Sequence, residues 1–202
     1  MSHTQDPEAP RLPPVVAIAA SAGGIGPLGE LLGALPAGFP GAVLAVVHLQ
    51  AGRVSVLPGM LARGTTLPVK QAEAMDRPRA GHVYVAAPDF HLVMGPSGRL
   101  RLSGAERENW SRPSADPLFE SVARACGDRA IAVVLSGMGV DGSRGVREVH
   151  RRGGTVIAQD GATSVHFDMP SASIATGFVD HVVPLPEIAP LLMRLLMPAT
   201  AP

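Results

Sequence analysis

The segment from residue 15 to residue 35 constrains the fold more than any other part of the sequence. Residues 15–20 are six consecutive apolar residues, a pattern typical of a strand that is buried on both faces. Ser21 and three small residues follow, and Pro27 then opens a helical run of leucines at positions 28, 31, 32 and 35. A strand that turns sharply into a helix holds Ser21 at the carboxyl edge of a sheet, beside free N–H groups of the helix. Such a turn can present a nucleophile.

Strand-like and helix-like patterns alternate along the remainder of the chain. Apolar runs predict further strands at 42–47, 67–70, 131–135, 155–159 and 182–183. Helical patterns are found at 55–63, 116–127, 143–152, 169–176 and 187–196, with Asp116 expected to cap the second of them. The alternation predicts an α/β fold: a doubly wound, mostly parallel sheet flanked by helices, with right-handed crossovers. Short alternating segments around residues 81–102 predict a small antiparallel β insertion.

Composition limits the class of protein. Seventeen basic and seventeen acidic residues give the 202-residue chain zero formal charge, so there is no general electrostatic case for binding nucleic acid or an anionic membrane. The hydrophobic content of 46% is ample for a core, and no apolar run approaches the roughly 20 residues that cross a bilayer. A single cysteine, Cys126, excludes an internal disulfide and fits a reducing compartment. We therefore expect a soluble cytoplasmic protein with no nucleic-acid partner and no membrane insertion, in which a disordered tail or linker at 1–14 precedes one domain at 15–202.

Three residues of complementary chemistry follow apolar runs. Ser21 and His48 each come directly after one, and Asp141 lies in a glycine-rich turn after a third. The carboxyl ends of parallel strands share one edge of a sheet, where ligands bind, so these side chains can meet there. A serine needs a base to take its proton, and the base needs a carboxylate to fix its tautomer. The pattern predicts a Ser-His-Asp hydrolase, with backbone N–H groups after Ser21 or at 137–139 forming an oxyanion hole.

The residues alone leave other functions open. A serine in a glycine-rich turn can also line a phosphate site, and an Asp-Gly pair is a common turn. A dinucleotide-binding domain fits the glycines after the first strand, but it needs an acidic residue at the end of the second strand, where this chain has His48. A non-catalytic binding module of the same fold is the second alternative. The remaining histidines are scattered without the spacing of a metal site.

Five ordered motifs cover nearly all of the chain from residue 15 onward. They are Ala20-Ser-Ala-Gly-Gly24, Val47-His-Leu-Gln50, His82-Val-Tyr-Val-Ala-Ala-Pro-Asp89, Arg112-Pro-Ser-Ala-Asp-Pro-Leu-Phe119, and Leu135-Ser-Gly-Met-Gly-Val-Asp-Gly142 with Ala158-Gln-Asp160 and Met169-Pro170 after it. The first resembles an Ala-Ser-Thr-Gly-Gly motif and the fourth an Arg-Pro-Ser-x-Asp-x-Leu-Phe motif. Together they resemble the catalytic domain of the chemotaxis protein-glutamate methylesterases, CheB.

This resemblance implies a doubly wound α/β hydrolase with Ser21 as nucleophile, His48 as base and Asp141 as its partner. It implies hydrolysis of γ-glutamyl methyl esters on the helices of a methyl-accepting chemoreceptor, deamidation of glutamine by the same chemistry, and no metal or organic cofactor. The residues that it places around the oxyanion or along the site are Ala22, Gly23, Gly24, Met138 and Gly139. Those that it places against the substrate are Arg112 and Met169.

Three departures from the family's pattern bear on rate and control. Ala22 stands where the family usually has threonine, and Gln50 stands where it commonly has proline. The family's N-terminal receiver domain is not in the sequence, so we expect a signalling partner to supply regulation in its place. Because the three triad residues are retained, we expect the activity to persist.

Overall fold

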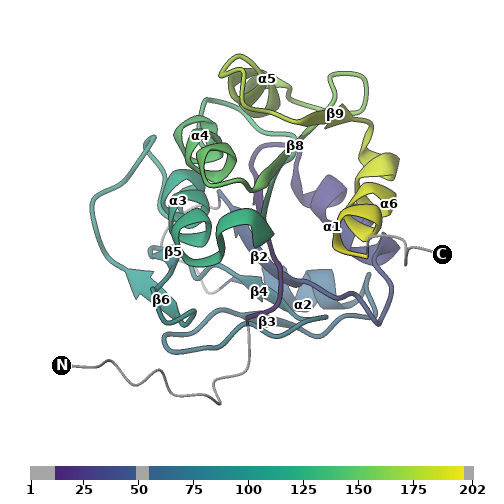
Figure 1. The fold of residues 1–202 in the computed structure, drawn as a ribbon. Coiled ribbons are helices and arrows are strands. Elements are labelled where there is room, and N and C mark those ends of the chain that lie inside the picture. Colours follow the sequence, from purple (N-terminus) through teal and green to yellow (C-terminus); the bar gives the residue numbers. More distant parts are fainter. Residues whose placement is uncertain (1–11, 49–54, 198–202) are drawn as a thin grey trace.

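A parallel β-sheet forms the centre of the computed structural model, which describes residues 12–48 and 55–197 (Figure 1). Within these residues the sheet has seven strands in the order β3-β4-β2-β1-β7-β8-β9, and every neighbouring pair is parallel. The strands are β1 (Val15–Ala20), β2 (Ala42–Val47), β3 (Val69–Gln71), β4 (Val83–Val85), β7 (Ala130–Val134), β8 (Thr155–Gln159) and β9 (His181–Val183). The predicted α/β class is therefore confirmed.

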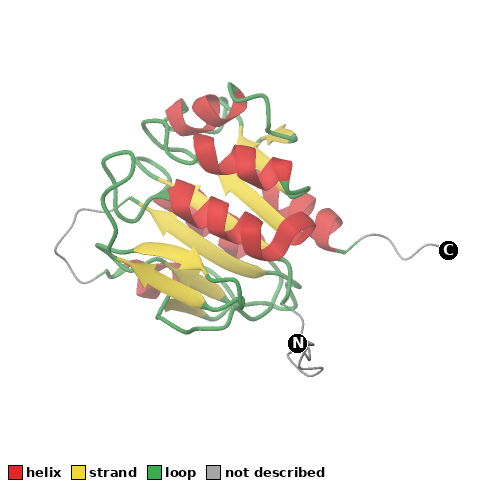
Figure 2. Cartoon of the chain, turned by 60° about the vertical axis from the view of Figure 1, so that its left-hand side comes forward, coloured by secondary structure: helices red, strands yellow, loops and turns green. Residues whose placement is uncertain are grey.

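Helices cover both faces of this sheet (Figure 2). One face carries α1 (Ile25–Ala34), α2 (Leu57–Ala62) and α6 (Leu185–Leu196). The other carries α3 (Ala115–Cys126), α4 (Ser143–Arg151) and α5 (Asp168–Ile174), and the 3₁₀ turn Gly127–Arg129 joins α3 to β7. The direction of strand order reverses at β1, which lies between β2 and β7. Open α/β sheets bind ligands at such a reversal.

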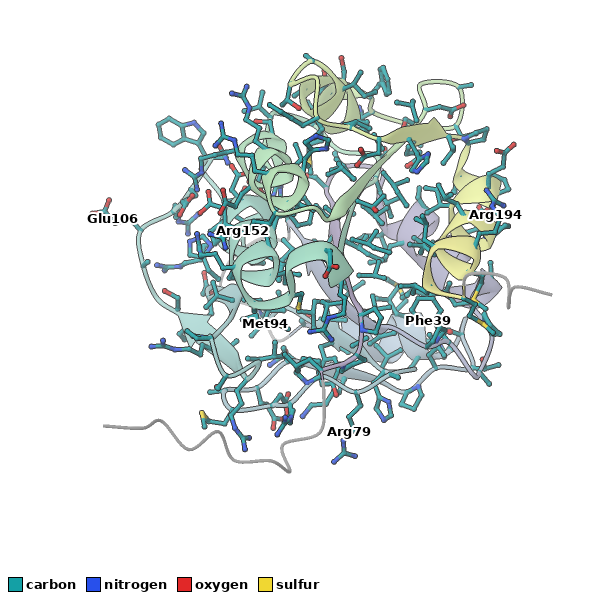
Figure 3. The ribbon with its side chains drawn as sticks, in the orientation of Figure 1. Phe39, Arg79, Met94, Glu106, Arg152 and Arg194 are labelled. Carbon is teal, nitrogen blue, oxygen red and sulfur yellow. The ribbon has the colours of Figure 1, made fainter. Side chains whose placement is uncertain are left out.

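Burial on both faces explains the apolar run of β1. Val16 and Ile18 pack in the cluster that contains the leucines of α1, whereas Ala17 packs in the cluster that contains the core of α3. Phe39 and Met94, labelled in Figure 3, belong to the first and the second cluster respectively. Full burial of one large apolar side chain contributes about 1.5–3 kcal/mol. The two cores together therefore hold the ends of β1, β2 and β7 in fixed relative positions.

The antiparallel insertion is smaller than the predicted range of 81–102. β4 belongs to the main sheet and runs parallel to β2 and β3, which corrects the prediction for its residues. The antiparallel pair consists of β5 (His91–Met94) and β6 (Leu100–Ser103). The valines of β4 pack in one core and Tyr84 in the other. Valine and tyrosine alternate in β4 because its two faces pack in two different cores, and not because one face is buried and the other exposed.

Three described residues before the predicted domain boundary at residue 15 contact the fold. The carbonyl oxygen of Pro14 accepts the N–H of Ala42 at 2.9 Å, and the Arg129 guanidinium donates to the carbonyl oxygen of Leu12. Residues 12–14 are therefore attached to the fold, while the rest of the predicted tail, 1–11, lies outside the described residues. Within the described chain, no helix has the length and apolar character needed to cross a membrane.

Candidate active site

Three neighbouring strands bring Ser21, His48 and Asp141 to one edge of the sheet. The last residues of β1 and β2 lie opposite each other in register, so Ser21 and His48 leave the sheet side by side. The N–H of His48 donates to the carbonyl oxygen of Ala20 at 3.2 Å, and the N–H of Ser21 donates to that of Ser136, beyond β7, at 3.1 Å. Backbone hydrogen bonds therefore fix the positions of the hydroxyl and the imidazole.

The three side chains are hydrogen-bonded in series. The Ser21 hydroxyl donates to His48 Nδ1 at 3.1 Å, and His48 Nε2 donates to Asp141 Oδ2 at 2.7 Å. A carboxylate on Nε2 holds the ring proton there and leaves Nδ1 free to accept a proton from serine. The His48 side chain is 15% exposed and that of Asp141 is 2% exposed, so the base can be reached from the surface and its partner cannot. This order of contacts is the one that activates a serine hydroxyl.

Asp141 is held as a carboxylate by its surroundings. Burial alone would raise its pKa, but hydrogen bonds from His48, the N–H of Ala115 and the Ser114 hydroxyl hold the pKa of Asp141 below its ordinary value. The N–H of Ala115 donates at 2.6 Å and that of Asp116 at 3.3 Å, which places the carboxylate at the start of α3. The positive end of a helix dipole also favours a negative charge. Asp141 is thus ionised and fixed in orientation.

Asn109 is a site residue that the sequence did not reveal. Its side-chain amide donates to Asp141 Oδ1 at 2.8 Å and to Asp116 Oδ2 at 2.9 Å. Asp116 also accepts hydrogen bonds from the N–H groups of Arg144 and Gly145 at the start of α4. Its pKa is raised, mainly by burial and secondly by the negative charge of the nearby Asp141. The amide therefore bridges two buried carboxylates. No motif marked it, because Asn109 lies in a polar loop far along the chain from Asp141.

The expected cap at Asp116 is corrected by these contacts. The carboxylate of Asp116 does not bond to the start of its own helix, α3, but to the first turn of α4. The N–H groups at the start of α3 donate to Asp141 instead. Each carboxylate thus satisfies N–H groups of a helix distant in sequence, which local capping rules cannot predict.

Two glycines allow the turns that carry Ser21 and Asp141 to approach each other. A Cβ on Gly137 would lie 2.8 Å from the Cβ of Ser21, and a Cβ on Gly24 would lie 2.4 Å from the carbonyl oxygen of Ser136. Neither separation is tolerated between real atoms, so the close approach requires glycine.

A cavity of about 330 Å³ opens over the triad. It is lined by Ser21, His48, Asn109, Trp110, Ser111, Met138, Gly139, Val140 and Asp141. Its volume is at the lower end of the range for small-molecule sites, roughly 300–1,000 Å³, and suits a single side chain better than a large cofactor.

The predicted oxyanion residues divide into two groups. Met138 and Gly139 line the cavity, whereas Ala22, Gly23 and Gly24 are not among its lining residues. Within the described chain, the backbone N–H groups of Ala22 and Met138 donate to no protein acceptor. Since no described residue uses either group, each is a candidate donor to a ligand atom.

The two residues predicted to contact substrate make other contacts. The Arg112 guanidinium donates to the carbonyl oxygens of Gly104 and Ala105 at 3.0 and 2.8 Å. Met169 is fully buried, and its N–H donates to the carbonyl oxygen of Gly137 at 2.9 Å. Neither lines the cavity, so these contacts favour structural roles, and a role in substrate binding stays a prediction. Gln50 lies outside the described residues.

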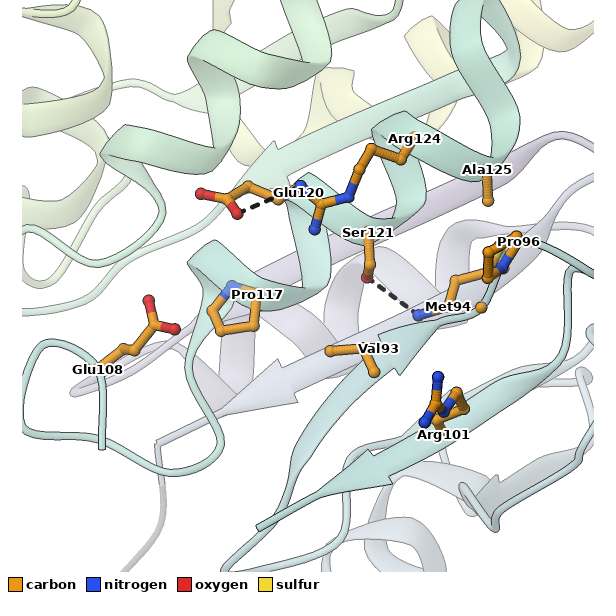
Figure 4. A pocket seen from close by; sticks show the side chains of 11 residues that line it. Val93, Met94, Pro96, Arg101, Glu108, Pro117, Glu120, Ser121, Arg124 and Ala125 are labelled. Carbon is orange, nitrogen blue, oxygen red and sulfur yellow. Dashed lines mark hydrogen bonds and ion pairs between the residues drawn. The ribbon is translucent and has the colours of Figure 1, made fainter. Parts of the chain in front are cut away.

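A second cavity, of about 340 Å³, lies between β5 and α3 (Figure 4). The Ser121 hydroxyl in its wall accepts the N–H of Met94 at 3.0 Å, and Arg124 is paired with Glu120 at 3.6 Å. No histidine is among its described lining residues, so Ser121 has no base. The nearby Cys126 is buried, which raises the pKa of its thiol to about 11 and makes it a poor nucleophile. The cavity over the triad is therefore the candidate active site.

Known proteins share both the sequence and the fold. The family model for CheB methylesterase matches residues 16–192. The protein-glutamate methylesterase/protein-glutamine glutaminase 4 of Myxococcus xanthus (strain DK1622) is 45% identical over 177 residues, which are 88% of this chain and 50% of that protein. The protein-glutamate methylesterase/protein-glutamine glutaminase 1 of Paramagnetospirillum magneticum is 40% identical over 190 residues, which are 92% of this chain and 50% of that protein. The chain thus spans about half the length of these curated relatives.

A solved structure gives the same result. The CheB methylesterase catalytic domain of Thermotoga maritima superposes with a TM-score of 0.87 at 35% identity, covering 92% of this chain and 100% of that domain. The family model, in turn, matches most of the chain. The chain therefore belongs to the CheB methylesterase family.

Proposed function

We propose that this protein is a protein-glutamate methylesterase that hydrolyses γ-glutamyl methyl esters on the helices of a chemoreceptor. The observation that carries the proposal is the hydrogen-bonded series of Ser21, His48 and Asp141 under an open cavity. The names of the relatives support the same reaction. A binding module would not need this series, and a dinucleotide site would need an acid where His48 bonds to Ser21.

The first half of the reaction is acyl transfer to Ser21. Its Oγ attacks the ester carbonyl carbon while His48 Nδ1, 3.1 Å away, accepts the hydroxyl proton. Asp141 stabilises the imidazolium through Nε2. When the tetrahedral intermediate collapses, the C–O bond to the methoxy group breaks, and His48 returns the proton to the departing oxygen as methanol leaves.

The second half is hydrolysis of the acyl-enzyme. A water molecule gives a proton to His48 Nδ1 and attacks the acyl carbon, and the bond to Ser21 Oγ breaks as that oxygen regains the proton. The product is a glutamate carboxylate. Glutamine side chains would react in the same way, with ammonia as the leaving group in place of methanol.

The N–H groups of Ala22 and Met138 are our candidates for the oxyanion hole. Both lack a protein acceptor within the described residues, and Met138 lines the cavity. Donors preorganised around a developing oxyanion supply much of the rate in acyl transfer.

The assay that tests the function is methanol release from a purified, methylated chemoreceptor fragment. We expect one methanol for each ester lost and a matching gain of glutamate carboxylate by mass spectrometry. The same fragment without methylation is the control for background. Absence of methanol release by folded protein, with the ester intact, would contradict the proposal. With a chemoreceptor as substrate, we expect the reaction to take place in the cytoplasm, under the control of a signalling partner.

Replacement of Asn109 with glycine should lower kcat about tenfold or more. A hydrogen bond to a charged group contributes roughly 1.5–3 kcal/mol, and each 1.4 kcal/mol lost from the transition state costs about tenfold in rate. Glycine suits the backbone at this position, where φ is +50°, so the variant removes the amide without adding strain. Steady-state kinetics together with Tm will separate slowed catalysis from unfolding.

Asn109→Asp is the matched variant. Its shape is the same, but a carboxylate would face Asp141 and Asp116 at hydrogen-bond distance. We therefore expect kcat to fall in the order wild type, Asn109→Gly, Asn109→Asp. Wild-type kcat in the glycine variant would show that Asp141 does not depend on the amide.

A further inference from the structure

Trp110 occupies an unfavourable backbone conformation. Glu108 and Ser111 exchange two backbone hydrogen bonds, of 3.1 and 2.9 Å, so Asn109 and Trp110 form the two-residue loop between them. Their φ angles are +50° and +64°, the positive pair that marks a type I′ turn. Glycine is the usual residue at the second position, because a bulky L-residue is strained there.

Packing against the fold does not explain the tryptophan. Trp110 is 94% exposed, and no hydrogen bond joins it to the described residues apart from the turn itself. A large aromatic residue that is both strained and exposed contributes little to folding. Strained residues of this kind are found preferentially at functional sites.

Trp110 lies at the opening of the triad cavity, with two further exposed apolar residues. Met138 and Val140, from the turn after β7, are each 56% exposed and line the same cavity. We call Trp110, Met138 and Val140 the apolar rim. Exposed apolar groups gathered around one opening are typical of a binding surface. The rim residues line the same cavity as Ser21, so a helix whose side chain reaches the triad must contact them.

The loop that carries Trp110 is fixed to the protein. The Asn109 amide bonds to Asp141 and Asp116, and Arg144 of α4 pairs with Glu108 and Glu120. Nearer β6, where Glu106 marks the loop in Figure 3, His91 Nε2 donates to the Glu106 carbonyl oxygen at 2.9 Å. The indole is therefore presented by an anchored loop.

We propose that the apolar rim binds the substrate helix itself, through apolar side chains about one turn from the esterified glutamate. The proposal rests on the function proposed above, since it is the ester at Ser21 that brings the helix to the rim. Residues three or four apart lie on one face of a helix, roughly 5–6 Å from each other. A helix is about 10–12 Å wide, so one that delivers a side chain to Ser21 also covers the rim. Trp110 is then a specificity residue for a helical protein over a small ester.

Trp110→Gly tests this proposal without endangering the fold. Glycine is the preferred residue for the turn, so we expect a Tm equal to or above that of wild type. For a methylated chemoreceptor fragment, kcat/KM should fall about tenfold or more, mainly through KM, because tryptophans that become buried on binding are common hot spots. For p-nitrophenyl acetate, which cannot reach across the rim, the fall should be far smaller.

Met75→Gly is the matched control. Met75 also has positive φ, +71°, and is 61% exposed, but it lines no part of the triad cavity. Like Trp110→Gly, the Met75→Gly variant removes an exposed apolar side chain and relieves the strain of a positive φ angle. We expect wild-type kinetics from it on both substrates.

Several outcomes would overturn the proposal. Unchanged kcat/KM of Trp110→Gly on the receptor fragment would do so, as would an equal loss on both substrates. If Trp110→Gly lost a self-association that the wild-type protein shows in sedimentation, and kept wild-type kinetics on the receptor fragment, the rim would instead be a contact with a second copy of the chain. Failure of the wild-type protein to release methanol from the fragment is a different result, which overturns the proposed function.

Discussion

Replacement of Ser21 with alanine is expected to reduce kcat for ester hydrolysis by roughly 10⁴- to 10⁶-fold while the protein remains folded. Among the described residues, the Ser21 side chain hydrogen-bonds only to His48 Nδ1, at 3.1 Å, so loss of Oγ removes the attacking atom and little else. The backbone bond from Ser21 to Ser136 is kept, as is the packing of β1. Tm should therefore change little.

The matched control is Ser171→Ala, the same substitution at an exposed serine of α5. It should keep both wild-type kcat and wild-type Tm. Near wild-type turnover by Ser21→Ala, measured by methanol release, would reject Ser21 as the nucleophile.

Asp141→Asn is expected to lower kcat by about 10⁴-fold through the tautomer of His48. Oδ1 of Asp141 accepts from four donors, which are Asn109, Ser114, Asp116 and Gly142. Oδ2 accepts from two, His48 Nε2 and the N–H of Ala115, so the new NH₂ group of asparagine disrupts fewer hydrogen bonds at the Oδ2 position, where it faces His48 Nε2. It would donate to Nε2 and drive the ring proton to Nδ1, which could then no longer accept the proton of Ser21.

The same substitution should also change the dependence of stability on acid. The pKa of Asp141 lies below its ordinary value in the folded protein, so the unfolded chain binds this proton more tightly. Its contribution to stability is present above the unfolded pKa and is lost as pH falls through the folded pKa. Asp141→Asn lacks this contribution, and its Tm should fall less steeply on acidification. Steady-state kinetics and thermal melts across the acidic pH range measure both effects. An unchanged kcat in Asp141→Asn would show that Asp141 has only a structural role in its turn.

The positions of Ser21 and His48 could be predicted because each follows an apolar strand directly, and parallel strands share one edge. Asp141 could be placed there too, since the strand before it was equally clear. The structure brings these three side chains together, while their catalytic roles stay predictions until activity is measured. Strand β4 was misassigned because Tyr84 made a fully buried strand look half-exposed.

The surroundings of the triad could not be predicted from the sequence. Asn109 bonds to Asp141, 32 residues further along the chain. Its turn has positive φ angles at two residues that are not glycine, so the sequence does not mark it as a turn of this type. The contacts of Asp116 and Asp141 with helix starts likewise depend on how α3 and α4 pack. Such contacts are set by tertiary structure, and neither periodicity nor capping patterns report them.

The most direct test of the site is covalent labelling with a fluorophosphonate at neutral pH, followed by peptide mass spectrometry. We predict a single adduct on Ser21 in the wild-type protein and almost none in His48→Ala, because the hydroxyl reacts only when a base takes its proton. Cys126 should not compete, since it is buried and its thiol has a pKa of about 11. Folded protein that is labelled at another residue, or equally fast without the imidazole, would contradict the assignment of Ser21 as an activated nucleophile.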